Sequence, residues 1–234
     1  MCNAACLIFA ATRISNQDVA GKRVLEIGSG DINGGLRRLI EFWQPAEYIG
    51  VDIEEGPGVD LVYDAEKLMD IFSEESFDVV LSTELLEHVL NPKMVISKIK
   101  RLCKRNGIIL LTTRSYGFEF HPYPYDFWRF ELSDMQSIFS DCEITDLEKD
   151  FVAPGVFVKV KKPSDFVERD LSGLELYNIV ANKRLVDMAC SDIAIKFKRK
   201  LFVFAVRSSA LTIAKTLNMG IIGLTRIFKV ILSM

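Results

Sequence analysis

Short apolar runs alternate along the first two thirds of the chain with segments in which apolar residues follow helical spacing. Helices are predicted after Asn33, from Asn91-Pro92 to an end at Asn106-Gly107, and over 133–139. Alternating strands and helices indicate a parallel, doubly wound α/β sheet. A tight connection around Pro154-Gly155 predicts a terminal hairpin, so the last strand should run antiparallel to its neighbours. The seven predicted strands are 23–29, 47–53, 59–63, 77–82, 107–113, 142–149 and 155–161.

Both ends of the chain extend beyond this pattern. The first eleven residues are apolar but lack a basic region and are short for a signal peptide, so we expect them to pack on the domain. Pro163 marks the predicted end of the core, which gives a domain at 1–163 and a helical extension at 164–234. Within the extension, 174–188 has helical periodicity that would suit a cap on the core or a partner surface.

Charge divides the chain unevenly although its net value is only −3. Residues 194–234 carry eight Lys or Arg and no acidic residue, which leaves −11 on residues 1–193. An acidic body argues against nucleic-acid binding. The tail is a basic, broadly amphipathic helix by its spacing, which would suit either peripheral contact with an anionic membrane or packing on protein, including a second subunit.

The cysteines and the hydropathy of the chain indicate where in the cell the protein is expected to be. The five cysteines are scattered and form neither a disulfide framework nor a Cys-x-x-Cys metal motif, so a reducing cytoplasm is the expected location. No run reaches the roughly 18 uninterrupted apolar residues that a membrane span needs. We therefore expect a cytoplasmic protein, with membrane association only through the tail.

Candidate chemistry is concentrated where the first two predicted strands end. Glu26 lies inside the first strand, and the chain then turns through Gly28, Ser29 and Gly30. The second strand ends in Asp52, 24 residues after Gly28. Glycines let a backbone approach a ligand closely, and an acid at the next strand end can hold ribose hydroxyls. The pattern predicts a site for a cofactor that contains a nucleoside.

A nicotinamide fingerprint would require G-x-G-x-x-G, and the third glycine is missing here. The residues instead resemble the class I S-adenosylmethionine-dependent methyltransferases of the type 11 subfamily, over roughly residues 20–163. One departure is Ile32, where many members have a third glycine. The resemblance implies a Rossmann-like domain that binds S-adenosyl-L-methionine. The residues that it assigns to the cofactor are Glu26, Gly28, Ser29, Gly30, Asp52, Ile53, Asp64, Ala65, Thr83, Glu84 and His88.

The acceptor site is predicted in the loop at 116–130, where eight of fifteen residues are aromatic. Aromatic rings mixed with His121, Asp126 and Arg129 suit a sugar or hydroxylated ring, although such a loop also suits an ordinary lid. The loop resembles methyltransferases of polysaccharide and lipopolysaccharide assembly. We expect His121 to act as general base, with Asp126 or Arg129 positioning the acceptor. No metal-ligand cluster stands out in the sequence, which predicts metal-independent transfer.

Several functions remain open at this point. The leading interpretation is O-methylation of a glycan or another small hydroxylated acceptor. One alternative is a quinone- or lipid-type methyltransferase at the membrane surface, which a membrane-binding tail would suit. Another is a protein that binds S-adenosylmethionine without turnover. A nicotinamide-dependent oxidoreductase is the least favoured interpretation.

Overall fold

The structure is a computed structural model that describes residues 3–32, 34–122 and 125–188. The chain divides into two compact units, Met1–Asp187 and Met188–Met234. The predicted basic tail at 194–234 therefore lies outside the described residues, and its membrane or protein contact stays a prediction. Within the described ranges, none of the helices has the length and hydropathy to cross a membrane.

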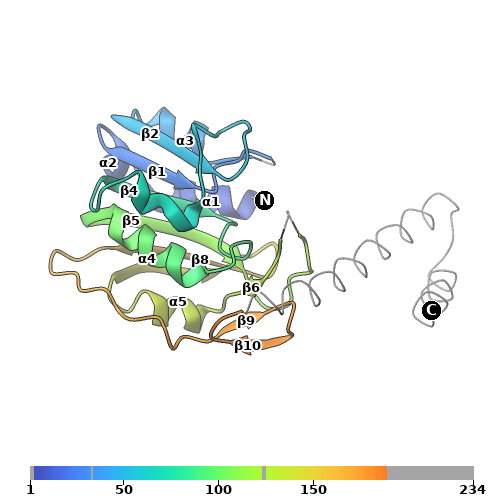
Figure 1. The fold of residues 1–234 in the computed structure, drawn as a ribbon. Helices are drawn as coiled ribbons and strands as arrows, with labels where there is room; N and C mark the ends of the chain where they lie inside the picture. The colour runs from blue at the N-terminus through green and yellow to red at the C-terminus, as the bar shows by residue number, and fades with distance from the viewer. Residues whose placement is uncertain (1–2, 33, 123–124, 189–234) are drawn as a thin grey trace, which may run out of the picture. The chain divides into compact units, whose positions relative to one another are not determined.

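The first unit contains a seven-stranded sheet with strand order β3-β2-β1-β4-β5-β8-β7, and Figure 1 labels its strands from β2 to β8. Its pairs are parallel except β5 with β8 and β8 with β7, which are antiparallel. The predicted doubly wound sheet with a reversed last strand is thus confirmed. The strands are β1 (Arg23–Ile27), β2 (Glu47–Asp52), β3 (Leu61–Val62), β4 (Phe77–Thr83), β5 (Cys103–Arg114), β7 (Glu143–Lys149) and β8 (Gly155–Lys161).

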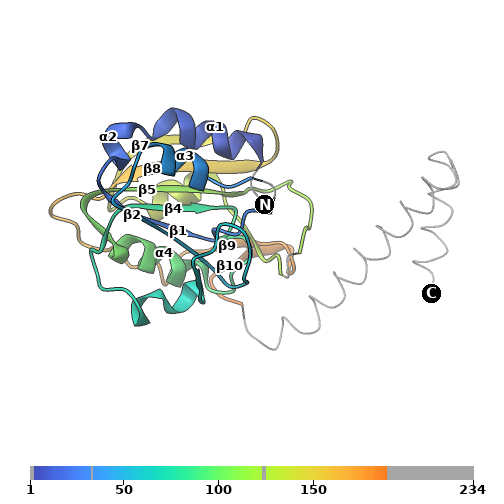
Figure 2. The ribbon, with the colours of Figure 1, turned by 90° about the horizontal axis from the view of Figure 1, so that it is seen from above.

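Helices cover both faces of this sheet. Figure 2 shows α1, α2 and α3 on one face and α4 on the other. The central strands are buried on both faces, which explains uninterrupted apolar stretches such as 79–81 in β4 and 108–111 in β5. The helices are α1 (Ala4–Arg13), α2 (Asn16–Val19), α3 (Arg37–Phe42), the 3-10 helix η1 (Ala65–Asp70), α4 (Pro92–Leu102) and α5 (Leu132–Ile138).

The apolar N-terminal segment packs on the domain as predicted, because it forms α1. The rings of Phe9 and Phe157 lie 5.2 Å apart between α1 and β8. Asn3 caps the helix by accepting a 3.1 Å hydrogen bond from the backbone N–H of Cys6. Its amide group also donates to Asp150 at 2.7 Å, which ties α1 to the end of β7.

Two predicted helix boundaries were wrong. The helix expected to begin at Asn33, a residue outside the described ranges, begins at Arg37. The helix expected to run to 106–107 ends at Leu102, and β5 follows it directly. Asn106 adopts a left-handed conformation with φ 62° inside β5, so the residue that suggested a helix end marks an irregularity in a strand.

The helix predicted at 174–188 was also wrong, because this segment forms strands. β9 (Leu176–Asn178) and β10 (Lys183–Leu185) pair antiparallel. β6 (Trp128–Arg129) joins them, giving a second sheet of order β10-β9-β6. Strands of two or three residues are too short for a two-residue period to be distinguished from helical spacing. The small sheet attaches this part of the predicted extension to the aromatic loop.

Candidate functional site

The glycine turn after β1 lies against the end of β2. The backbone N–H of Gly28, whose φ is +79°, donates to Val51 O at 2.8 Å. A Cβ on Gly28 would lie 3.0 Å from Leu85, and one on Gly30 would lie 3.0 Å from Asp52 Oδ2. A side chain at position 28 would be strained by the positive φ, and one at position 30 would require Asp52 to shift, so the turn fits closely between β2 and the segment after β4.

Glu26 is buried beneath this turn, where it contacts the Tyr48 hydroxyl and accepts a hydrogen bond from the backbone of Leu36. Burial raises the pKa of Glu26 to about 7, against the opposing effects of the Tyr48 hydrogen bond and the Arg37 charge. The acid thus links β1 to β2 and to the start of α3, on either side of the turn.

The predicted nucleoside-binding residues lie at the ends of β2 and β3. Asp52 is half-buried and accepts hydrogen bonds from Gly30 N at 2.9 Å and Ile53 N at 2.7 Å. Ile53 is 63% exposed. Asp64 caps η1 by accepting from Glu66 N at 2.9 Å, and Ala65 begins that helix. Asp52 faces the glycine turn, and carboxylate oxygens retain lone pairs for further donors.

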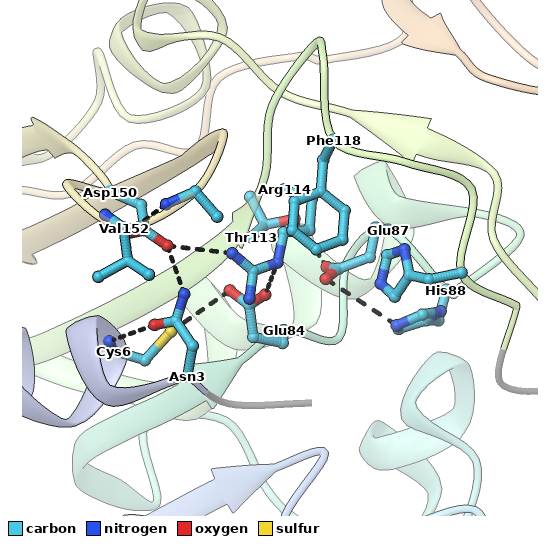
Figure 3. Close-up of polar contacts among 12 residues, drawn as sticks. Asn3, Cys6, Glu84, Glu87, His88, Thr113, Arg114, Phe118, Asp150 and Val152 are labelled. Atoms are coloured by element: carbon cyan, nitrogen blue, oxygen red, sulfur yellow. Dashed lines mark hydrogen bonds and ion pairs between the residues drawn. The ribbon is translucent and has the colours of Figure 1, made fainter. Parts of the chain in front are cut away.

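The segment after β4 begins with a buried acid in a rarely populated backbone conformation. Glu84 has φ 55°, and its carboxylate forms an ion pair with Arg114 at the end of β5 (Figure 3). Arg114 also donates to Asp150 at 3.0 Å. Cys6 Sγ lies 3.6 Å from Glu84 Oε1, so α1 contacts the same group. Burial and the neighbouring Glu87 raise the pKa of Glu84 well above its ordinary value, against the effect of Arg114.

Arg114 and Asp150 were not among the predicted site residues. Their side chains are 3% and 0% exposed, and Arg114 also stacks over the ring of Phe118 at 4.3 Å. The one signal in the sequence is an arginine that ends the apolar run of β5, a position at which a charge needs a partner. One partner, Asp150, lies 36 positions further along the chain.

Further along the same segment, Glu87 and His88 face His121 of the aromatic loop. The two imidazole rings lie 4.9 Å apart and edge to face. His88 is held by a 2.5 Å contact between its Nδ1 and Tyr125 O, and burial lowers its pKa. Glu87 is fully buried and accepts a 2.8 Å hydrogen bond from Thr113. Glu87 was not among the site residues predicted from the sequence.

Asp126 and Arg129 form a buried bidentate pair with contacts of 2.5 and 2.8 Å. Asp126 also accepts a hydrogen bond from His121 N at 2.8 Å and lies 3.1 Å from His121 Nδ1. Arg129 donates to the backbone oxygen of Glu119 at 3.0 Å. Burial alone would raise the pKa of Asp126, but hydrogen bonds from Arg129 and His121 hold it below its usual range.

These contacts place Asp126 and Arg129 differently from the sequence-based expectation. Their charged groups are directed at each other and at the loop backbone, so the geometry favours their positioning of His121 over direct contact with an acceptor. Leu85 meets the glycine turn and His88 meets His121. The predicted cofactor and acceptor residues therefore form one continuous region, apart from Asp64 and Ala65 at the start of η1.

The sequence matches a protein-family model over much of its length. A model described as a methyltransferase domain matches residues 7–150. Ubiquinone biosynthesis O-methyltransferase of Pseudomonas entomophila (strain L48) is 35% identical over 109 residues. Phthiotriol/phenolphthiotriol dimycocerosates methyltransferase 1 of Mycobacterium ulcerans (strain Agy99) is 34% identical over 107 residues. Both matches cover 41% of this chain but only 45% and 38% of the two relatives, so this chain spans less than half of their length.

Solved structures share the fold at low sequence identity. An S-adenosylmethionine-dependent methyltransferase from Mesorhizobium loti has a TM-score of 0.52 and 16% identity, covering 68% of this chain and 99% of that one. The 1,6-didemethyltoxoflavin-N1-methyltransferase of Burkholderia thailandensis, which was solved with S-adenosylhomocysteine, has a TM-score of 0.54 and 12% identity, covering 69% and 80%. At this identity the likeness concerns the fold alone.

Proposed function

The chain belongs to the class I S-adenosylmethionine-dependent methyltransferases, and from this premise we propose that it methylates a hydroxyl oxygen of a glycan or another small acceptor. The family model covers more than half of the chain, and the sheet has the expected reversed last strand. The contact that carries the proposal is the one between His121 Nδ1 and Asp126. It pairs an imidazole with a carboxylate beside the cofactor-binding segment, as a general base for a hydroxyl requires.

The residues of the glycine turn fit S-adenosylmethionine. The Ser29 hydroxyl is buried and has no hydrogen-bond partner within the described residues, which leaves a polar group for a ligand. Asp52 lies beside the turn at a strand end, where a carboxylate can accept from ribose hydroxyls. When bound, the cofactor supplies an electrophilic methyl group on a sulfonium. The chain's own part is to align the acceptor oxygen, exclude water and accept its proton.

His121 is arranged to accept that proton. Its Nδ1 lies within 3.2 Å of two acceptors, Asp126 Oδ2 and Glu119 O, so this nitrogen carries the hydrogen in the neutral ring. Nε2 then holds a free lone pair. Asp126 is fixed by Arg129, which orients the imidazole in the way that a buried aspartate orients a catalytic histidine.

A quinone- or lipid-type acceptor is the second candidate, and the names of the relatives favour it. One is an O-methyltransferase of ubiquinone biosynthesis, and another methylates phthiotriol and phenolphthiotriol dimycocerosates. A phenolic hydroxyl on a lipid-linked ring would use the same base. A basic tail that binds anionic membrane would bring such an acceptor to the site.

Methyl transfer from labelled cofactor tests both candidates, with soluble hydroxylated glycans and a prenylated catechol as the two acceptor classes. His121→Asn retains a polar group near Asp126 but removes Nε2, so turnover should fall at least about a hundredfold while affinity for S-adenosylhomocysteine stays unchanged. Glu119→Gln, on an exposed side chain two residues away, is the matched control. Undiminished turnover in His121→Asn would remove His121 from the mechanism. Calorimetry with NAD in place of S-adenosylhomocysteine should give no binding.

A further inference from the structure

Three possible metal-ligand atoms converge where the end of β4 meets the aromatic loop. One atom each from Glu87, His88 and His121 lie within 4.8 Å of one another. These are the only two histidines in the sequence. Figure 3 shows Glu87 beside His88, and the His88 and His121 rings meet edge to face. Both imidazoles of the protein are therefore at one point, although 33 residues separate them along the chain.

The hydrogen-bond partners fix which nitrogen of each ring is free. His88 Nδ1 lies 2.5 Å from Tyr125 O, and a carbonyl oxygen only accepts, so Nδ1 carries the hydrogen. His121 Nδ1 faces Asp126 Oδ2 and Glu119 O, and the same reasoning applies. Both Nε2 atoms are consequently lone-pair donors rather than hydrogen donors. Which nitrogen bears the hydrogen is inferred from these partners.

The third atom is a buried oxygen without a hydrogen bond. Glu87 is fully buried, and its Oε2 accepts from Thr113 at 2.8 Å. Its Oε1 has no hydrogen-bond partner among the described residues and lies 3.9 Å from His88 Nε2. Glu87 Oε1 and His88 Nε2 thus face each other with no hydrogen between them, and His121 brings a ring nitrogen to the same group. A buried carboxylate oxygen in that state is costly unless a positive charge compensates it.

We propose that Glu87, His88 and His121 bind one divalent cation of the borderline class that includes Zn²⁺ and Co²⁺. Two imidazole nitrogens and one carboxylate are a known ligand set for such ions, and they leave a fourth position open. Bonds of about 2.1 Å in tetrahedral geometry separate ligand atoms by roughly 3.4 Å, so binding must draw these side chains together by about an ångström. This proposal replaces the sequence-based expectation of metal-independent transfer.

The surroundings of the three ligands support a built site. Tyr125 O orients His88, Asp126 orients His121 and Thr113 orients Glu87. Outer contacts of this kind fix the tautomer and direction of metal ligands. The neighbouring acid Glu84 is not a ligand, because its carboxylate is engaged by Arg114. The sequence motif alone would not have separated the two acids.

A bound cation changes how the acceptor loses its proton, and this step rests on the proposed function. An acceptor hydroxyl in the open position has a lower pKa, so its proton passes to solvent water. The oxygen keeps the electron pair, forms the bond to the methyl carbon, and the carbon–sulfur bond breaks to leave a neutral thioether. His121 is then a ligand and not the base.

Cobalt titration of the full-length, tag-free protein tests the proposal after treatment with a chelator. We expect one Co²⁺ per chain, visible by its ligand-field absorption and displaced by Zn²⁺. In protein labelled with ¹⁵N-histidine, Zn²⁺ should shift both Nε2 signals. Glu87→Gln and His121→Asn should each weaken Co²⁺ binding by about tenfold or more, whereas Glu119→Gln should not. Because the histidine signals are measured on the wild-type protein, this part of the test does not depend on whether a variant folds.

Three results would overturn the cation site. The histidine signals could stay unshifted, or a thiolate charge-transfer band could show that cysteine binds the Co²⁺. The third is an equal Co²⁺ affinity in the wild type and in His121→Asn. If these measurements exclude the cation site and the chelator-treated protein still methylates a hydroxyl, His121 remains the base and the proposed function stands. If the cation binds as expected but no hydroxylated acceptor is methylated with or without it, the proposed function fails and the site remains.

Discussion

Replacing Arg114 by methionine should cost far more stability than removing an ordinary surface ion pair. Arg114 pairs with Glu84 and Asp150, and all three side chains are 3% exposed or less. Methionine fills similar volume but leaves two buried carboxylates without their cation. Breaking a buried pair in this way costs about 3–5 kcal/mol. For a domain of this size that is a fall in Tm of about 6–20 °C.

The measurement is urea unfolding of the full chain at pH 7, with Arg101→Met as matched control. Arg101 pairs with Glu74 at the surface, where the side chains are 43% and 58% exposed, so its loss should change stability much less than the loss of Arg114. The triple variant Arg114→Met, Glu84→Gln and Asp150→Asn should recover most of the lost stability, because it leaves no unpaired charge.

The deficit should also depend on pH. Burial and Glu87 raise the pKa of Glu84, and Arg114 opposes this effect. Without Arg114 the folded-state pKa of Glu84 rises further above its unfolded value, so the folded state binds more protons than the unfolded state. Stability of the single variant then falls as pH rises, and the difference from wild type should be smaller at pH 5 than at pH 8. A loss below about 1 kcal/mol at pH 7, or no recovery in the triple variant, would refute the assignment of Arg114 as a buried counter-ion.

Three further outcomes follow from the cofactor-binding region. The folded pKa of Glu26 is raised to about 7, so its effect on stability declines as pH rises from about 4.5 to 7, by about 3 kcal/mol, and Glu26→Gln should abolish this slope in unfolding measured across that range. A Cβ on Gly50 would overlap Gly58 O, so Gly50→Ala should lose about 1–3 kcal/mol in thermal unfolding, whereas Gly56→Ala, with open space around it, should not. Asp52→Ala should weaken S-adenosylhomocysteine binding by about 10- to 100-fold in calorimetry, and an unchanged affinity would exclude Asp52 from the ribose site.

The sequence predicted the large sheet well because its strands are buried on both faces. The central strands contain uninterrupted apolar stretches, such as 79–81 in β4 and 108–111 in β5, and such stretches are distinctive without knowledge of neighbours. The hairpin of β7 and β8 followed from a short connection. The small second sheet was missed because its strands, such as Leu176–Asn178, are short and pair with the aromatic loop, a partner distant in sequence.

In the candidate site, too, the features set by the sheet were predictable and those set by loop packing were not. Residues that follow strands in a parallel sheet, such as Gly28 and Asp52, meet at one edge by topology, so their motif was visible in the sequence. The pairing of Arg114 with Asp150 and the convergence of Glu87 with His121 depend on how loops pack. No periodicity or spacing encodes such contacts, which is why Asp126 and Arg129 were placed against an acceptor instead of against each other.

The connection between Asn3 and Asp150 also sets an order of events during synthesis of the chain. The contacts of Asn3 with Asp150 and of Phe9 with Phe157 join residues that are about 150 positions apart in the chain. At a synthesis rate of about 5–20 residues per second, roughly 7–30 s pass between the synthesis of α1 and that of these two contact residues. α1 is therefore synthesised well before β7 and β8 and can complete its packing only after they have been made. Until β7 and β8 arrive it is a natural target for chaperones.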